Sequence, residues 1–598
     1  MHGGVGVDLT DEAVIVDWIT ENPTTASEAS GAGVPSWRYA LEEISDAVVI
    51  PGVDSVGYSR SLKYKYVQPY THNSRPFAQF LDKRSANLAG LEGPSRDVIL
   101  SEFVPPSVRD LYEHISGYGL PGPDGSLVSD SEFALLLREL ATIERRQSRI
   151  SGWLDPAMLP KISVPSNTSP GIRWKKLGYR SKKDALMPAL VEATRMVKRM
   201  VESGEEYSVP PCAVAGRGKR VQIDRDTSGT RKEGRLIVMP DLARHLVGTM
   251  ASGTLASETK RVDKSEGGIL LGMGPFSDSY SQISQWCEGA GSFLFLDFKG
   301  FDQKVPARVL SKAFLHMQSA FEKEPGSAAY WRSEFRQLVH TEVVMPGGYV
   351  YRKHRGVASG DPWTSLAGSY SNWLMLSVIA KRLGIKTKIW TFGDDSIIAI
   401  WGSHPPRILD RFKEMAWDLF GMVVSAEKSY YSRNLTDIES SPTEKVSGSF
   451  LSMYFLETPM GVRPTRPLQD VYELMLVPER VRDDIGWEIV RTSMAYLVFY
   501  YNEDARYLLE EYWDYLHSEY RVPELTGSSR DIELLRQMDI PWSSFKLEWL
   551  NRLPWPGEVE LLYKYGHTGF HVPILWGVWY SGDDDPYGNQ LSFDPRVP

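Results

Sequence analysis

Two short apolar runs that end in carboxylates constrain this chain more than any other feature of its sequence. SFLFLD, at 292–297, and TFGDDSIIAI, at 391–400, have the length and the aromatic or β-branched content of buried strands. A Gly-Asp-Asp turn interrupts the second run, which predicts a hairpin. Between the two runs, the spacing of apolar residues over 364–383 predicts a helix. Such a chain is expected to combine packed helices with a sheet that carries carboxylates at the ends of its strands.

Length and composition indicate a large globular chain. The 598 residues are 42% hydrophobic and 24% charged, which allows sizeable cores and excludes global disorder. Two cysteines are present, Cys212 and Cys287, so a disulfide scaffold and a cysteine-cluster zinc site are excluded, and both thiols are predicted to be buried. The N-terminus has no secretory pattern, and no apolar run reaches the roughly eighteen residues of a membrane helix. A soluble, non-secreted protein without a membrane segment is expected.

Helical spacing of apolar residues also occurs outside the strand region. It predicts helices at 131–146 and 184–202 and a helical, aromatic region after about residue 468. Gly, Ser and Pro punctuate roughly the first hundred residues, which predicts an extension with long loops. Trp- and Pro-rich loops are expected from Pro541 onward.

The charge of the chain is unevenly distributed. Although the formal net charge is −9, the stretch 161–235 holds 17 Lys and Arg residues against 8 Asp and Glu residues. This local surplus of +9 leaves −18 for all other residues together. A strongly basic stretch in an acidic chain suits contact with a nucleic acid, and a solvated basic face is the structural alternative.

Four carboxylates at the predicted strand ends could carry chemistry. Asp297 and Asp302 stand where the first strand ends, and the turn of the predicted hairpin contains Asp394 and Asp395. On adjacent strands Asp297 and Asp394 could hold two Mg²⁺ ions roughly 3.5–4 Å apart, with Mn²⁺ as a substitute, and this arrangement serves phosphoryl transfer. Solvated turn residues are the alternative. A second copy of the triplet, at 582–585, precedes a proline and lacks a following strand, which predicts a surface turn.

A loop of small residues separates the two acidic regions. In the segment RGVASGDPWTSLAGSYSNW, at 355–373, Ser359 and Gly360 form a flexible turn that allows close approach of a ligand. Thr364 is expected to begin the following helix. An ordinary loop and N-cap ahead of a core helix is the alternative interpretation.

These blocks, in this order, resemble the motifs of viral RNA-dependent RNA polymerases over roughly 168–455. The elements similar to motifs A, B and C of that family are Asp297-x4-Asp302, Ser359-Gly360-x3-Thr364 and Gly393-Asp394-Asp395. The resemblance implies that Asp302 selects the ribose of the incoming nucleotide.

Flanking segments resemble further motifs of the same polymerases. The segment TSPG, at 168–171, is similar to motif G, which guides the template. Lys232 and Arg235, followed by LIVMPD, resemble motif F, whose cations contact the incoming triphosphate. Lys428 is similar to the motif D lysine proposed as general acid for pyrophosphate, and the Phe-Leu pair at 450–451 is similar to the start of motif E.

Two positions depart from the family's patterns. Nine residues after the motif B serine, where an asparagine is usual, this chain has Gly368, and Asn372 follows one helical turn later on the same face. The contact with the ribose 2′-hydroxyl is therefore expected from Asp302 together with Thr364 or Asn372. Motif E lacks its usual basic residue, because Ser and Met occupy 452–453.

The basic stretch suits an RNA substrate under this resemblance. Its cations interleave with Trp174 and Tyr179, as in a channel that combines phosphate neutralisation with base stacking. The residues predicted to bind the template are Thr168, Ser169, Gly171, Arg173, Lys175 and Lys176. Those predicted to bind the nucleotide are Arg231, Lys232, Arg235, Asp302, Ser359, Gly360, Thr364 and Asn372. The nucleotide entrance is also expected to include Arg217, Lys219, Arg220 and Arg225.

The resemblance implies an α+β fold of the right-hand polymerase type, with fingers, palm and thumb and an antiparallel palm sheet flanked by helices. The expected domains are an N-terminal extension at 1–100, fingers at 101–290, a palm at 291–460 with a finger insertion at 303–350, and a thumb and C-terminal region at 461–598.

The activity that the resemblance implies is that of an RNA-directed RNA polymerase, a nucleotidyltransferase that replicates and transcribes a viral RNA genome. Asp297, Asp394 and Asp395 would bind the metal ions, and Lys428 would protonate the leaving group. The segments TSPGIRW, GVASGDPWTS and LVPER are most similar to polymerases of partitivirus-like and picobirnavirus-like double-stranded RNA viruses. Expected partners are RNA template and product, ribonucleoside triphosphates and a viral capsid protein, and the expected locations are the virion interior and the host cytoplasm.

Two rival functions remain open at this point. A reverse transcriptase also pairs carboxylates in a palm, but Phe392 precedes Gly393 where that class favours Tyr-x-Asp-Asp. A structural or capsid-associated protein would bind RNA whether or not Asp297 and Asp394 were intact.

Overall fold

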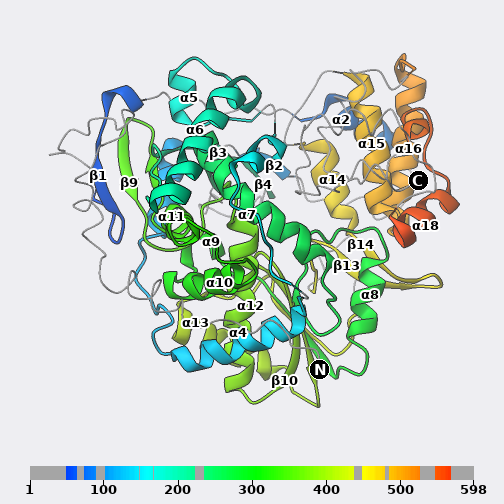
Figure 1. Ribbon diagram of the computed structural model, residues 1–598. Coiled ribbons are helices and arrows are strands. Elements are labelled where there is room, and N and C mark those ends of the chain that lie inside the picture. The colour runs from blue at the N-terminus through cyan, green and yellow to red at the C-terminus, as the bar shows by residue number, and fades with distance from the viewer. Residues whose placement is uncertain are drawn as a thin grey trace.

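The computed structural model describes ten stretches of the chain: 49–63, 73–88, 101–104, 106–146, 148–165, 168–222, 235–436, 448–478, 484–524 and 546–566. Helices and sheets are mixed along these stretches, as the α+β prediction requires (Figure 1). No helix among the described residues is both long enough and apolar enough to cross a membrane. Cys212 and Cys287 are both buried free thiols, as predicted.

A five-stranded central sheet carries the predicted carboxylates. Its strands, in spatial order, are β12 (Tyr430–Ser432), β7 (Ser292–Leu296), β11 (Asp395–Trp401), β10 (Lys386–Phe392) and β6 (Gly268–Ile269). Both strands predicted from the apolar runs are confirmed, and β10 and β11 form the predicted hairpin. The antiparallel prediction holds for four strands but is wrong for β6, which pairs with β10 in parallel. A long helix precedes β6 in the chain. A strand that follows such a helix can run parallel or antiparallel to its neighbour.

The two faces of the central sheet contact different layers. Along β7 the side chains alternate, so that Leu294 and Leu296 join one core and Phe293 and Phe295 join another. On the first face lies α12 (Thr364–Arg382), the helix predicted at 364–383, which contacts β10. Every residue of α12 from Leu366 to Ala380 is buried, as expected for a helix enclosed on all sides.

Three further helices enclose α12 on that first face. They are α4 (Asp130–Glu144), α10 (Ala307–Ser319) and α13 (Arg407–Phe420). On the second face lie α8 (Ser279–Trp286) and a hairpin of β13 (Tyr454–Thr458) and β14 (Gly461–Thr465). The sheet is therefore buried on both sides, and only the ends of its strands can present polar groups.

A second five-stranded sheet joins segments that are far apart in the sequence. Its order is β1 (Asp54–Tyr58), β9 (Tyr349–Arg352), β8 (Glu342–Val344), β3 (Cys212–Arg217) and β5 (Arg235–Met239). Figure 1 shows β1 beside β9 at one edge of the molecule. The N-terminal segment, the basic stretch and the segment before the Ser-Gly loop thus share one sheet. A short ribbon of β2 (Ser101–Val104) and β4 (Lys219–Gln222) lies apart from it.

Helices of the basic stretch pack against helices that follow it in the chain. The predicted helix at 184–202 is α6 (Lys182–Ser203), which packs against α7 (Leu242–Arg261). The helix α11 (Ser327–Val339) also contacts α6. Shorter helices are α3 (Val108–Gly117), α5 (Ile172–Lys176) and α9 (Phe301–Lys304). Capping boxes at Ser129 and Ser181 begin α4 and α6.

The C-terminal region is helical, as predicted after residue 468. It contains α14 (Leu468–Leu476), α15 (Ile485–Phe499) and α16 (Glu503–Glu519), which pack with α2 (Arg75–Leu88) from the N-terminal region (Figure 1). The ring of Phe77 in α2 meets Tyr512 edge-on at 4.8 Å between centroids. The N-terminal segment therefore contacts both the second sheet and the C-terminal helices.

The prediction of loops from Pro541 onward is wrong for one segment. Residues Pro556–Tyr565 form a helix, α18, that begins with proline at a position where the missing N–H costs nothing. It buries Val559, Leu562 and Tyr563 on one face. The spacing of these residues is helical, but the surrounding Trp and Pro obscured it. The second Gly-Asp-Asp copy, at 582–585, lies outside the described residues.

Candidate active site

The fold brings three of the predicted carboxylates to one end of the central sheet. Asp297 follows directly after β7, and Asp394 lies in the turn between β10 and β11, whose first residue is Asp395. Because β7 and β11 pair with Leu296 opposite Ser396, Asp297 and Asp395 emerge side by side. Burial, together with the charges of Asp394 and Asp297, raises the pKa of Asp395 to about 7. Mutual repulsion of this kind marks a site that a cation would neutralise.

The Gly-Asp turn is held by the buried helix α12. Gly393 has a φ of +61°, which favours glycine, and its N–H donates to Ser369 Oγ at 2.8 Å. Asn372 Nδ2 donates to the carbonyl oxygens of Gly393 and Asp394, at 3.0 and 3.1 Å. The sequence analysis placed Asn372 at the nucleotide, and the structure places its amide on the turn. The prediction from sequence did not include Ser369. Two polar residues three positions apart on an apolar helix nevertheless indicate a shared polar contact.

The chain just before β12 faces Asp297. Lys428 Nζ lies 3.4 Å from Asp297 Oδ2, and both the backbone N–H and the carbonyl of Asp297 contact Ser429 Oγ. Burial raises the pKa of Asp297, and Lys428 opposes that shift. Because the Lys428 side chain is 63% exposed, the ion pair is screened by water and contributes little to stability. Asp297 therefore holds Lys428 only weakly.

Asp302 and Ser359 meet although 57 positions separate them. Ser359 Oγ donates to Asp302 Oδ2 at 2.8 Å, which fixes the carboxylate that the sequence analysis assigned to ribose selection. Burial raises the pKa of Asp302, the Ser359 bond lowers it, and the charge of Arg235 also lowers it. Thr364 begins α12 as predicted, but its hydroxyl donates to the carbonyl of Ala358 and so closes the loop on itself.

The Ser-Gly loop runs along β5, the strand that carries Arg235. The N–H of Val238 donates to the Ser359 carbonyl at 2.9 Å. Gly360 has a φ of +104°, and a Cβ at this position would lie 2.3 Å from the Val238 carbonyl oxygen. The sequence predicted that a ligand comes close to the turn at Gly360. In the structure, the backbone of β5 comes close to it instead. Arg235 is exposed, and its charge lowers the pKa values of both Asp297 and Asp302. Arg231 and Lys232, with Arg225, lie outside the described residues.

The residues predicted to bind the template divide into two groups. Thr168, Lys175 and Lys176 are exposed, and Lys176 Nζ donates to the Lys63 carbonyl. Arg173, in contrast, is buried and forms an ion pair with Asp241 at 3.0 Å. The structure therefore gives Arg173 a packing partner within the protein.

The loop ahead of α5 has a conformation that requires glycine. Gly171 has a φ of +95° and lies against the backbone of Pro240 and Asp241, and its N–H donates to Ser169 Oγ. The expectation that Trp174 stacks on bases is wrong, because its indole is 5% exposed and belongs to the main core. Tyr179 is partly buried against the same core.

The turn that follows Phe450 also contacts the carboxylates. Leu451 and Ser452 have φ values of +52° and +60°, which are strained for residues with side chains. The N–H and carbonyl of Phe450 bond those of Met453 across this turn, and the N–H of Leu451 points at the Asp395 carboxylate and lowers its pKa. This backbone donor could not be predicted from the sequence, because a residue of any type can supply a backbone N–H.

The donor set fits a hard divalent cation that takes part of its coordination from substrate. No three His, Cys, Asp or Glu side chains in the described stretches converge as a preformed metal cage. Mg²⁺ in phosphoryl-transfer sites is usually bound by one or two carboxylates, with waters and substrate phosphates completing the shell. Asp297 and Asp394, whose charges already repel Asp395, offer ligands of this kind.

Carboxylates at adjacent strand ends, a neighbouring lysine and an exposed arginine are the kinds of side chain used by the class of enzymes that transfers phosphoryl groups with bound cations. Within that class the chain can be placed further. Residues 230–476, which include all of these groups, match the family model of the viral RNA-dependent RNA polymerases. The chain is an RNA-directed RNA polymerase, a nucleotidyltransferase.

Replacing Asn372 with alanine tests whether this side chain holds the turn or the nucleotide. The change leaves two carbonyls of the Gly-Asp turn without their donor, which is expected to destabilise the fold by about 1–3 kcal/mol and to lower kcat. If Asn372 acts through the turn, the preference for ribonucleotides over deoxyribonucleotides stays as in the wild type. Steady-state kinetics with both substrates measure this, and a specific loss of ribonucleotide preference would instead place Asn372 at the ribose.

Proposed function

We propose that this chain copies single-stranded RNA by a two-metal mechanism, in the replication and transcription of a viral RNA genome. The observation that carries the proposal is the meeting of Asp297, Asp394 and Asp395 at one sheet end, beside an Asp302 held by Ser359. The reaction joins a 3′-hydroxyl to the α-phosphate of a ribonucleoside triphosphate and releases pyrophosphate.

Each site residue has a role in this proposal. Asp297 and Asp394, assisted by Asp395, hold two Mg²⁺ ions, for which Mn²⁺ can substitute. When bound, these ions activate the attacking hydroxyl and neutralise the leaving pyrophosphate. Lys428, exposed and within 3.4 Å of Asp297, delivers a proton to the leaving group.

The nucleotide and the template are received by different parts of the chain. Asp302 orients toward the ribose, with Ser359 holding its carboxylate, and Arg235 meets the triphosphate together with Arg231 and Lys232. The exposed Lys175 and Lys176, with Thr168, Ser169 and Gly171, guide the template backbone.

The domain organisation that we propose is that of a right hand. Fingers span 101–290, the palm spans 291–460 with the finger insertion 303–350, and the thumb and C-terminal region span 461–598. The shared sheet supports this division, since β8 of the insertion pairs with β3 of the fingers. The extension at 1–100 acts as a buttress, because β1 extends the same sheet and α2 packs on the C-terminal helices.

The assignment to a group of viruses rests on three short segments of the sequence. The segments TSPGIRW, GVASGDPWTS and LVPER support a polymerase of the partitivirus-like and picobirnavirus-like double-stranded RNA viruses. For such a virus we place the enzyme in the virion interior and in the host cytoplasm, with a capsid protein as partner. Co-purification of the chain with empty capsid shells tests the partner, and recovery of free monomer alone would contradict it.

The activity is tested with the full chain, single-stranded RNA and labelled nucleotides in the presence of Mg²⁺ or Mn²⁺. The proposal expects template-length RNA from ribonucleotides and much less product from deoxyribonucleotides. A preference for deoxyribonucleotides would favour a reverse transcriptase. RNA binding without pyrophosphate release would instead favour a structural RNA-binding protein.

A further inference from the structure

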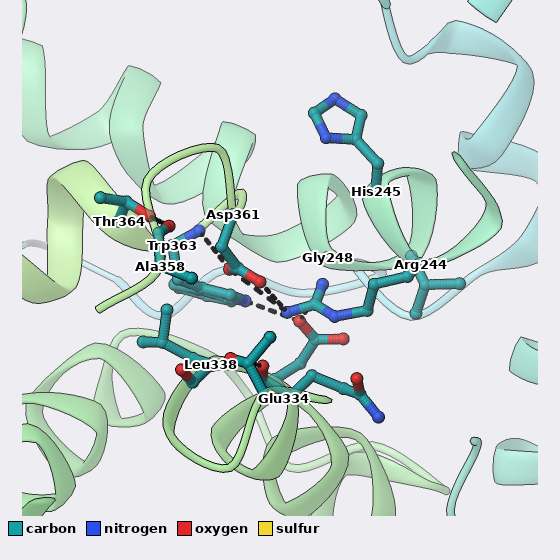
Figure 2. Close-up of polar contacts among 12 residues, drawn as sticks. Arg244, His245, Gly248, Glu334, Leu338, Ala358, Asp361, Trp363 and Thr364 are labelled. Atoms are coloured by element: carbon teal, nitrogen blue, oxygen red, sulfur yellow. Dashed lines mark hydrogen bonds and ion pairs between the residues drawn. The ribbon is translucent and has the colours of Figure 1, made fainter. Parts of the chain in front are cut away.

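A buried network of charged groups lies behind the Ser-Gly loop, away from the carboxylates of the sheet. Arg244, on α7, is 1% exposed, and its guanidinium lies 2.8 Å from Glu334 Oε2 and 3.1 Å from Asp361 Oδ2 (Figure 2). Glu334, on α11, also accepts from the hydroxyl of Tyr207 and, at 2.7 Å, from the indole N–H of Trp363. Four segments of the chain thus meet around one guanidinium.

Two members of this network belong to the loop itself. Asp361 follows Gly360 directly, and its carboxylate accepts from the N–H of Trp363 at 3.0 Å while it pairs with Arg244. The N–H of Asp361 donates to the Ala358 carbonyl, and the N–H of Thr364 donates to the Asp361 carbonyl. The loop 358–364 is therefore a compact turn whose anchoring point is the Asp361 carboxylate.

The helix that carries Arg244 is itself fixed to two other predicted substrate-binding elements. It continues from β5, which begins with Arg235, and its N-cap Asp241 pairs with Arg173 of α5. The N–H of Leu242 donates to the carbonyl of Pro170 in the predicted template segment. Through Arg244, α7 connects these elements to the loop that holds Ser359.

A glycine on α7 makes room for the guanidinium in its present position. A Cβ at Gly248, one helical turn after Arg244, would lie 2.1 Å from Arg244 Nη1 and 3.0 Å from Glu334 Oε2 (Figure 2). Glycine at 248 is thus required for the guanidinium to lie between the two carboxylates. This close fit fixes where Asp361, and with it the loop, stands relative to α7.

Such a network is a costly way to stabilise a core. It buries one cation with two carboxylates, and burial raises the pKa of Glu334 to about 7 while Arg244 acts in the opposite direction. Well-packed apolar residues of similar volume are often as stabilising as a buried ion pair. What a guanidinium adds is direction, since Arg244 Nη2 donates to both carboxylate oxygens of Asp361, at 3.3 and 3.1 Å, while Nη1 lies in ion-pair contact with Glu334.

We propose that Arg244 is a positioning residue for substrate selection, which sets the loop 358–364 so that Ser359 holds Asp302 in the orientation that selects ribose. This inference rests on the proposed function. It predicts that disturbing Arg244 lowers discrimination between ribonucleotides and deoxyribonucleotides, because Ser359 stands two residues from Asp361 and donates directly to Asp302.

Three variants disturb the network in different ways. Arg244→Lys keeps the charge and removes the fork, Asp361→Asn removes the charge of the loop anchor at constant size, and Gly248→Ala pushes the guanidinium aside without deleting any charge. Arg491→Lys is the matched control, because Arg491 is 6% exposed, pairs with Glu488 at 2.7 Å and lies in the C-terminal helices.

The measurement is kcat and KM for a ribonucleotide and for its deoxy analogue, with thermal unfolding of each full-length variant. Each network variant is expected to lower the ratio of the two kcat/KM values by about tenfold, mainly through KM for the ribonucleotide. Arg491→Lys is expected to lower the unfolding temperature and to leave the ratio unchanged. If one network variant fails to fold, the other two decide.

The contradicting results are separable. An active wild type whose network variants lose activity equally for both nucleotides, at an unchanged ratio, would overturn the positioning role and leave the polymerase intact. A wild type that makes no RNA on any template would overturn the proposed function, and the inference with it.

Discussion

Replacing Asp394 with asparagine is expected to reduce RNA synthesis by at least about 100-fold while leaving the protein as stable as the wild type. The loss follows because the variant removes one of the charges that would bind cations and stabilise the charge that develops during transfer. The stability is retained because Asp394 and Asp297 already repel Asp395, whose pKa they raise to about 7. Removing one of three clustered negative charges relieves that repulsion.

The measurement combines labelled ribonucleotide incorporation with thermal unfolding, each with and without Mg²⁺. A cation that binds the folded chain raises the unfolding temperature of the wild type, and this increase is expected to shrink in Asp394→Asn. Asp583→Asn is the matched control, because the second Gly-Asp-Asp triplet has the same sequence and is predicted to be a surface turn. Equal incorporation by the wild type and Asp394→Asn would remove Asp394 from the catalytic site.

The end of the sheet that carries the carboxylates could be predicted from sequence because its signals are local. A strand buried on both faces appears as a continuous apolar run, and a carboxylate at the end of such a run is conspicuous. SFLFLD and TFGDDSIIAI are runs of this kind, and both strands lie at the residues predicted from them. Glycine in a short turn between two apolar runs likewise predicts a hairpin from the sequence alone.

The ion pairs between distant segments around this site could not be predicted, because they follow no repeating pattern in the sequence. Arg244 meets Asp361 across 117 positions, and nothing near Arg244 distinguishes it from other helix arginines. Arg173 shows the same limit in the opposite direction, since a basic run suggested a solvent-facing cation and the fold buried it against Asp241. A run of charged residues predicts that the segment as a whole faces solvent. The ion pair that a single residue forms depends on the tertiary fold.

Gly360→Ala is expected to have the second large effect, a loss of about 100-fold in kcat/KM for ribonucleotides. The added methyl would lie 2.3 Å from the carbonyl oxygen of Val238, a backbone atom of β5 that cannot turn away as a side chain would. The loop must therefore move off the strand, and the bond from the Val238 N–H to the Ser359 carbonyl must stretch or break. Ser359 would then no longer hold Asp302 at 2.8 Å.

The strain of a positive φ has to be separated from the steric contact, and the chain offers a glycine that does so. Gly402 has the same φ of +104°, but a Cβ there would have its nearest described neighbour, His404 Nε2, at 3.5 Å. Gly402→Ala should therefore show the conformational cost alone, about 1–2 kcal/mol of unfolding free energy, with kcat/KM close to that of the wild type. If both variants lose activity alike, backbone strain explains the loss, and the contact between the loop and β5 does not set the site. If Gly360→Ala alone loses ribonucleotide kcat/KM, the strand that carries Arg235 and the loop that carries Ser359 act as one unit in holding Asp302.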